Sequence, residues 1–201
     1  MHEANQSAAG PTAVKCLLKL GACSELAVVL RGHAINKSAA GGDGVRRLLD
    51  LAETRFGLLQ ESREKDRGRG TAVHDDILSA LSALVAAVQR HPENQSAAGG
   101  AAVHRLLQLV ETSGGHPDVQ AKALSTFVAV VSDHEANKSA AGPTAVECLL
   151  KLSHPSGDEP YVQKDALKAL REVVVNHAGN TAALTAAGDA GAHGRCVLSD
   201  L

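Results

Sequence analysis

The chain has 201 residues and a formal net charge of −2, and its only aromatic residues are Phe56, Phe127 and Tyr161. So few rings offer little for bases to stack on, and the charge leaves no basic footprint for phosphates, which excludes nucleic acid as a partner. No basic segment followed by an apolar stretch opens the sequence, and no segment is expected to span a membrane. We therefore expect a soluble intracellular protein without a membrane partner, cytoplasmic with the nucleus as the alternative.

A repeated block dominates the sequence. The pattern His-x-x-Asn-x-Ser-Ala-Ala-Gly begins at His2, His33, His91 and His134, and a decayed fifth copy begins at His177. An apolar pattern with helical spacing follows each complete block. Residues 2–20 and 134–152 differ at only two of nineteen positions, Gln6/Lys138 and Lys15/Glu147, which indicates recent duplication. Self-similarity of this kind predicts stacked units that bury their apolar faces against their neighbours.

The spacing of the histidines sets the boundaries of the copies. It is 43 residues from His91 to His134 and from His134 to His177, but 58 from His33 to His91 and 31 from His2 to His33. One copy therefore carries an insertion and the first copy is shortened. The predicted units are a truncated repeat at 1–32, a repeat at 33–90 with an inserted charged loop at about 54–70, repeats at 91–133 and 134–176, and a partial repeat at 177–201.

Both irregular copies allow two interpretations. Residues 12–30 form either a single helix bent at Gly21 or the remnant of a truncated reading frame. The inserted segment, Glu61–Gly70, lacks apolar periodicity and is expected to be a solvated loop. The alternative is a docking element for an anionic partner, which would use the segment's four basic residues, Arg63, Lys65, Arg67 and Arg69.

The copy at 134–176 shows the expected internal structure. Asn137 is expected to cap a single helical turn, and Gly142 to end it at a position that needs positive φ. Pro143 then starts a second helix that runs to about Leu152. Its predicted buried side comprises Val146, Cys148, Leu149 and Leu150. After a loop at 153–160, a third helix carries an apolar stripe made of Val162, Ala166, Leu167, Leu170 and Val174.

These features resemble the armadillo repeat. The resemblance is carried by Pro117-Asp-Val-Gln-Ala-Lys-Ala-Leu124, then Asn137, Ala141-Gly142 and Ala145-Val146-Glu-Cys-Leu149-Leu150, and it covers most of residues 71–190. HEAT repeats are the nearest competitor, but the short helix before Gly142 favours armadillo. The resemblance implies an all-α, right-handed superhelical solenoid of about four to five helical repeats.

Residues with catalytic or metal-binding chemistry are present but do not form a recognisable site. One histidine per repeat gives a ladder that cannot converge on one metal ion, so we interpret these rings as packing at helix ends near a C-terminal dipole. Cys16 and Cys148 occupy equivalent positions and are expected to be buried apolar residues. No serine lies in a nucleophile pattern, and the glycine-rich stretches lack the context of a phosphate loop. We expect no enzyme activity, no metal, no cofactor and no small-molecule substrate.

The resemblance points to the third helices as the contact surface. Importin-α-like members of the family bind basic peptides there through repeated Trp and Asn residues, and this chain has no Trp and no Asn at the equivalent positions. Those positions form a predicted partner-binding ridge: Ser82, Ala86, Ser125, Ala129, Lys168 and Glu172. The function expected is a non-catalytic scaffold that binds a protein or peptide through this ridge. The alternatives are an importin-like cargo adaptor with a degenerate groove, a regulatory repeat segment of a larger protein, and a partner that binds the inserted loop instead.

Overall fold

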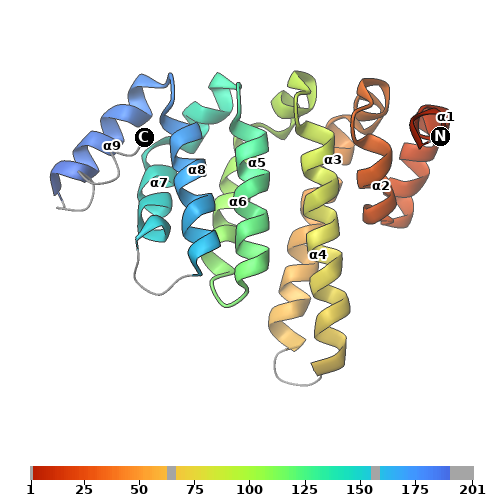
Figure 1. Ribbon diagram of the computed structural model, residues 1–201, viewed down its shortest axis with the longest axis horizontal. Helices are drawn as coiled ribbons and strands as arrows, with labels where there is room; N and C mark the ends of the chain where they lie inside the picture. The colour runs from red at the N-terminus through yellow and green to blue at the C-terminus, as the bar shows by residue number, and fades with distance from the viewer. Residues whose placement is uncertain (1, 63–66, 155–158, 191–201) are drawn as a thin grey trace. The chain divides into compact units, whose positions relative to one another are not determined.

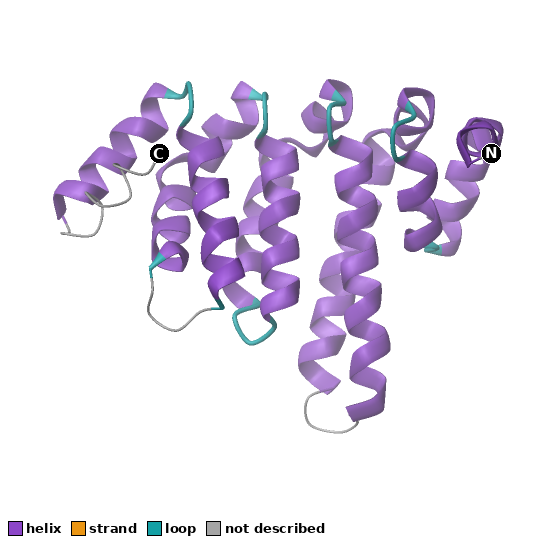
Figure 2. Ribbon diagram, in the orientation of Figure 1, coloured by secondary structure: helices purple, strands orange, loops and turns teal. Residues whose placement is uncertain are grey.

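The computed structural model describes residues 2–62, 67–154 and 159–190, and within these ranges every regular element is an α-helix (Figures 1 and 2). The helices in chain order are α1 (His2–Leu20), α2 (Cys23–Leu30), α3 (Ala34–Ser62), α4 (Arg67–Val88), α5 (Pro92–Thr112), α6 (Pro117–Val131), α7 (Glu135–Ser153), α8 (Pro160–Val174) and α9 (Ala178–Ala190). The all-α class predicted from the sequence is confirmed. The chain divides into two compact units, Met1–Ala98 and Gly99–Leu201, which we call the N-terminal unit and the C-terminal unit.

A glycine kink divides the first helix of each complete copy into two parts. The kinks lie at Gly10, Gly41, Gly99 and Gly142, with φ between 55° and 61° and ψ within 20° of ±180°. Only glycine adopts this backbone region readily, which explains why the block ends in glycine. The prediction that Gly142 ends a short helix at positive φ is therefore confirmed. Helix α9 has Thr185 at this position and runs through without such a kink.

The N-terminal unit is built on the long antiparallel pair α3 and α4. Helix α1 packs on α3, and α2 packs on α4. Its core is aliphatic with one aromatic ring, and its main members are Val14, Leu26, Leu30, Val45, Leu48, Leu49, Phe56, Ile77, Leu81 and Leu84. In the C-terminal unit α8 packs on both α6 and α7, and α7 packs on α9. The buried side chains of this unit include Val119, Phe127, Val146, Leu149, Val162 and Leu170.

The inserted residues of the second copy extend two helices. Helix α3 continues to Ser62 and α4 begins at Arg67, so the loop predicted at about 54–70 is wrong for 54–62 and 67–70, while 63–66 lie outside the described residues. Phe56 and Leu59, three residues apart, are buried along this extension. Arg55 pairs with Asp76 of α4 at 3.4 Å. The extension of α3 therefore includes a buried apolar pair and an ion pair to α4.

The first copy is a pair of helices, and the single bent helix proposed for 12–30 is wrong. Helix α1 ends at Leu20, Gly21 has φ 69°, and α2 begins at Cys23. The Gly21 and Ala22 amides donate to Leu18 and Leu17 carbonyls, which closes the end of α1. The shortening falls on the third-helix position, because α2 has only 8 residues whereas α6 and α8 have 15 each.

The expectation that no segment is long and apolar enough to span a membrane is wrong for helix α4. Its stretch Thr71–Val88 has a mean hydropathy of 1.4 and is long and apolar enough, by length and composition, to cross a membrane. A core helix of a folded domain passes the same test. Ile77, Leu81 and Leu84 on this stretch are at most 1% exposed inside the N-terminal unit, as expected for a core helix.

Candidate functional site

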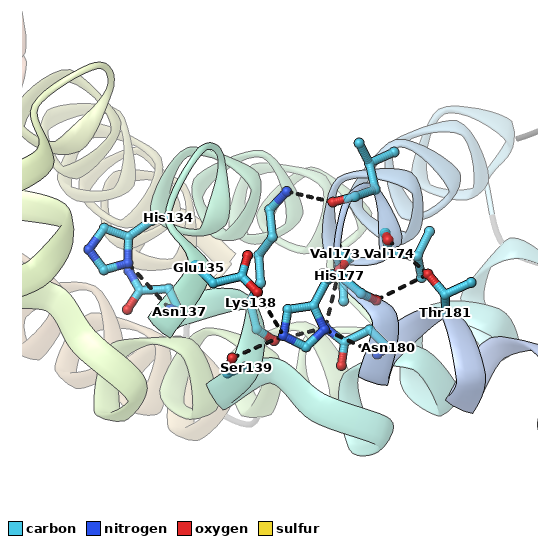
Figure 3. Close-up of polar contacts among 11 residues, drawn as sticks. His134, Glu135, Asn137, Lys138, Ser139, Val173, Val174, His177, Asn180 and Thr181 are labelled. Atoms are coloured by element: carbon cyan, nitrogen blue, oxygen red, sulfur yellow. Dashed lines mark hydrogen bonds and ion pairs between the residues drawn. The ribbon is translucent and has the colours of Figure 1, made fainter.

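The repeated histidine is the N-cap of the helix that follows it. His134 Nδ1 accepts a hydrogen bond from the Asn137 amide at 3.3 Å (Figure 3). His91 and His177 accept from the amides three residues ahead in the same way, at 3.3 and 3.1 Å. The sequence predicts only that these rings pack at the end of the preceding helix. Each ring also accepts a hydrogen bond from an amide in the first turn of the next helix, which has no partner within that helix.

The repeated asparagine has a different role from the one predicted. Asn137 Nδ2 donates to the Val130 carbonyl of α6 at 2.9 Å, so its side chain closes the end of the preceding helix and does not cap α7. Asn36, Asn94 and Asn180 donate to the carbonyl seven residues earlier in the same way, at 2.9 to 3.1 Å. In every case the acceptor is the penultimate residue of the preceding helix, where carbonyls lack intrahelical partners.

The same block also bonds adjacent copies to one another. In the C-terminal unit, Asn180 Nδ2 donates to the Lys138 carbonyl at 2.8 Å, and Ser139 Oγ lies 2.9 Å from His177 Nε2 (Figure 3). Lys138 Nζ reaches the Val175 carbonyl at 3.0 Å. His177 Nδ1 accepts from the Asn180 amide, so Nε2 is the nitrogen that carries the ring proton, and it faces both Ser139 Oγ and, at 3.6 Å, Glu135 Oε1.

The N-terminal unit repeats this arrangement with different residues. Asn94 donates to the Lys37 carbonyl at 2.9 Å, Ser38 Oγ lies 3.0 Å from His91 Nε2, and Lys37 Nζ donates to the Gln89 carbonyl at 2.6 Å. We call each such set of His, Asn, Lys and Ser contacts between two copies a joint. Two joints with the same donors and acceptors show that the block holds neighbouring copies together.

Small residues complete the packing at these joints. A Cβ on Gly42 would lie 3.0 Å from Ala97 Cβ, and one on Gly100 would lie 3.1 Å from Ala140 Cβ. These are equivalent pairs, each between one copy and the next. His104 Nε2 adds a contact of 3.0 Å to the Ala140 carbonyl. The alanines of the block therefore allow the backbones of neighbouring helices to approach closely.

The cysteines have unreactive surroundings where they are buried. Burial raises the pKa of Cys148 to about 12, with the nearby Glu111 carboxylate as the second cause. Burial, Asp76 and Glu25 also raise the pKa of Cys23. A nucleophilic thiol needs the opposite shift. Cys16 is exposed, so its predicted burial is wrong, and Cys196 lies outside the described residues.

One cavity of about 500 Å³ lies in the N-terminal unit. It lies beside the turn between α1 and α2, and residues of α3 and α4 complete its lining. Its charged lining residues are Lys19, Glu25, Arg47, Arg55 and Asp76. Arg55 is paired with Asp76, and Arg47 donates to the Lys19 carbonyl at 3.2 Å. The described residues contain no group of three or more His, Cys, Asp or Glu side chains that could hold a metal ion.

The predicted ridge is only partly accessible. Ala86 of α4 and Ala129 of α6 are 7% and 8% exposed, so a partner would reach little of either. Ser82 and Ser125 are half-buried, and their hydroxyls donate to carbonyls of their own helices, at Leu78 and Lys122. Sequence alone could not show this, because alanine and serine suit a buried and an exposed helix face equally.

The ridge positions on α8 are the more accessible ones. Lys168 is exposed, and Glu172 is half-buried with its carboxylate 3.7 Å from Lys138 Nζ. Glu172 therefore also balances the charge of Lys138, whose side chain is 7% exposed at the joint. Because α6 packs on α8, Ser125, Lys168 and Glu172 belong to neighbouring helices of one unit.

One ridge residue was missed. Tyr161 of α8 is 41% exposed and lies seven residues before Lys168, which is two turns along the same helix face. Its hydroxyl donates to Asp118 of α6 at 3.0 Å. The spacing to Lys168 and the scarcity of aromatic residues could have identified it, since tyrosine is enriched at protein interfaces.

Comparison with known proteins gives no relative from which to transfer a function. No family model, no curated protein and no solved structure matches the chain.

Proposed function

We propose that the chain is an armadillo-type solenoid that acts as a non-catalytic scaffold for a protein or peptide partner in the cytoplasm. The observation that carries this proposal is the pair of equivalent joints, Ser38–His91 and Ser139–His177 with their neighbouring Asn and Lys contacts. The repeated His, Ser and Asn side chains, which the sequence offers as candidates for chemistry, form hydrogen bonds between neighbouring copies. What is left to interact with other molecules is the surface of the helices.

The binding surface proposed lies on the C-terminal unit. It keeps Ser125, Lys168 and Glu172 of the predicted ridge and adds Asp118 and Tyr161, and it is the ridge meant from here on. It combines an exposed aromatic ring, an exposed cation and two carboxylates on the neighbouring helices α6 and α8. Tyrosine rings flanked by charged groups often contribute most to binding at such surfaces. The raised thiol pKa values of Cys23 and Cys148 argue against covalent catalysis by these residues.

The test is a quantitative affinity capture from native lysate with four forms of the full chain. These are wild type, a Tyr161→Ala/Lys168→Glu ridge variant, a Leu58→Asp variant on the α3 extension, and Lys151→Glu as the matched control. Lys151 is an exposed lysine of α7, outside the ridge. Circular dichroism checks that all four are equally helical.

We expect partners retained by wild type and Lys151→Glu to be lost with the ridge variant alone. Loss with Leu58→Asp alone would move the site to the extended helix pair, which replaces the loop considered from the sequence. If wild type and the ridge variant retain the same proteins in the same amounts, the ridge proposal is wrong. A Lys/Arg-rich peptide that binds wild type and not the ridge variant would favour the cargo-adaptor alternative.

A further inference from the structure

The two nearly identical segments of the chain, 2–20 and 134–152, occupy different surroundings. Ala145, Cys148 and Leu149 are buried in α7, with exposures of 0, 5 and 0%. Their counterparts in α1 are Ala13, Cys16 and Leu17, of which Cys16 is exposed and the other two are half-exposed. The next residue of the series, Leu20, is 79% exposed, whereas its counterpart Leu152 is half-buried.

These four positions form one face of α1. Ala13, Cys16, Leu17 and Leu20 are spaced by three, one and three residues, which places them in a single stripe. We call them the α1 stripe. Helix α1 packs on α2 and α3 through other residues, such as the fully buried Val14. The residues that differ in burial are the same amino acids in both segments, so the cause of the difference is the neighbour and not the sequence.

The C-terminal unit shows which helix approaches the equivalent face of α7. Helix α5 approaches through Gly100, which lies against Ala140, and through His104, which contacts the Ala140 carbonyl. Farther along α5, the Glu111 carboxylate lies against the Cys148 thiol, and Lys151 is near the same thiol. Helix α5 therefore brings an acidic residue to the cysteine of this face, and α8 and α9 also pack on α7.

The charges beside the α1 stripe favour the same kind of partner more strongly. One of the two substitutions between the segments places Lys15 where α7 has Glu147, and Lys19 corresponds to Lys151. Both Lys15 and Lys19 are exposed. Lys15 and Lys19 lie about one turn apart on the Cys16 side of the α1 stripe, so an acidic residue beside the apolar face of a partner helix is attracted to that edge, whereas a second α1 would be repelled.

We propose that the α1 stripe is a docking surface for an amphipathic helix that carries acidic residues beside its apolar face, in the way that α5 approaches α7. This surface is separate from the ridge, and either one can fail without the other. Complete burial of Leu20 alone contributes a factor of about 10 to 150 in affinity.

The probe is a fluorescent, helix-stabilised peptide with the sequence of residues 99–113, titrated up to about 1 mM into the full chain. We expect saturable binding to wild type, at least tenfold weaker binding to Leu20→Asp, and unchanged binding to Ile35→Asp. Ile35 is the matched control because it is a comparably exposed aliphatic side chain, at 72%, and lies off the stripe. Circular dichroism confirms that both variants remain folded.

A charge exchange makes the test specific. Lys15→Glu/Lys19→Glu should weaken binding of the peptide at least tenfold, and a peptide with Glu111→Lys should bind this variant better than it binds wild type. The peptide should also protect Cys16 from alkylation. The proposal is overturned if the peptide does not bind, if Leu20→Asp binds like Ile35→Asp, or if the charge exchange gives no recovery. Sedimentation velocity tests the alternative that a second molecule of this chain binds the stripe. A dimer that Leu20→Asp abolishes would support that alternative and contradict the acidic-helix proposal.

Discussion

Replacement of Asn94 by alanine should cost more stability than an ordinary polar substitution on a helix. Asn94 is 2% exposed, and its amide donates to the Lys37 and Ala87 carbonyls, both at 2.9 Å. Alanine would remove both hydrogen bonds and leave two buried acceptors without this donor. At about 1 kcal/mol net per hydrogen bond, and more for an acceptor that stays unsatisfied, we expect a loss of about 2–4 kcal/mol. That is a large part of the stability of a small domain.

Urea unfolding followed by circular dichroism at equal protein concentration measures this loss. Glu93→Ala is the matched control, because Glu93 is exposed and precedes Asn94 directly. We expect the control to change the unfolding free energy by less than about 0.5 kcal/mol. If Asn94→Ala changes it no more than the control does, Asn94 does not hold the two copies together and the reasoning about the joint is refuted.

Three further substitutions test the backbone and the buried thiol. Gly142→Ala should destabilise the chain by about 1–3 kcal/mol, because Gly142 has φ 56° and ψ −164°, whereas Gly57→Ala inside α3 should be neutral or stabilising. Equal effects of the two substitutions on the urea unfolding free energy would contradict the role of Gly142 at the kink. Arg90→Gly should stabilise by about 0.5–1 kcal/mol, because Arg90 has φ 54° at the position where the first copy has Gly32. A higher urea midpoint is the expected result, whereas a lower one would mean that the arginine side chain contributes more than its backbone strain costs. Burial raises the pKa of Cys148 from an ordinary value of 9.0 to about 12, so the stabilising contribution of the thiol is complete below pH 9 and is lost as the pH rises toward 12. The unfolding free energy of Cys148→Ala should therefore fall less steeply than that of wild type over this range, and parallel pH profiles would refute the pKa shift.

The elements that depend on local chemistry could be predicted from the sequence. The apolar spacing predicted the second and third helices around Val146 and Leu170, and the position of Gly142 predicted the kink, because both effects act within a few residues. The same reasoning failed for the inserted segment. Its polar residues gave no periodic signal, whereas the structure continues α3 to Ser62 and begins α4 at Arg67, with Phe56 and Leu59 buried.

The features that depend on a neighbour could not be predicted. Asn137 looked like a helix cap because its own turn offers donors, but its true acceptor lies seven residues earlier at the end of α6. Cys16 and Cys148 are equivalent in sequence, yet Cys16 is exposed whereas Cys148 is buried beside Glu111 of α5. The predicted ridge could be placed on the third helices, yet the burial of Ala86 and Ala129 and the exposure of Tyr161 follow from how those helices pack.

The side chains of the repeated block bond one copy to the next. A double-mutant cycle between Ser139 and His177, whose Oγ and Nε2 atoms are 2.9 Å apart, tests this most directly. The cycle compares urea unfolding of wild type, Ser139→Ala, His177→Ala and the double variant. We expect a favourable coupling free energy of about 0.5–1.5 kcal/mol. Additivity within about 0.3 kcal/mol would contradict it, since the two side chains would then contribute independently and would not form a bond between the copies.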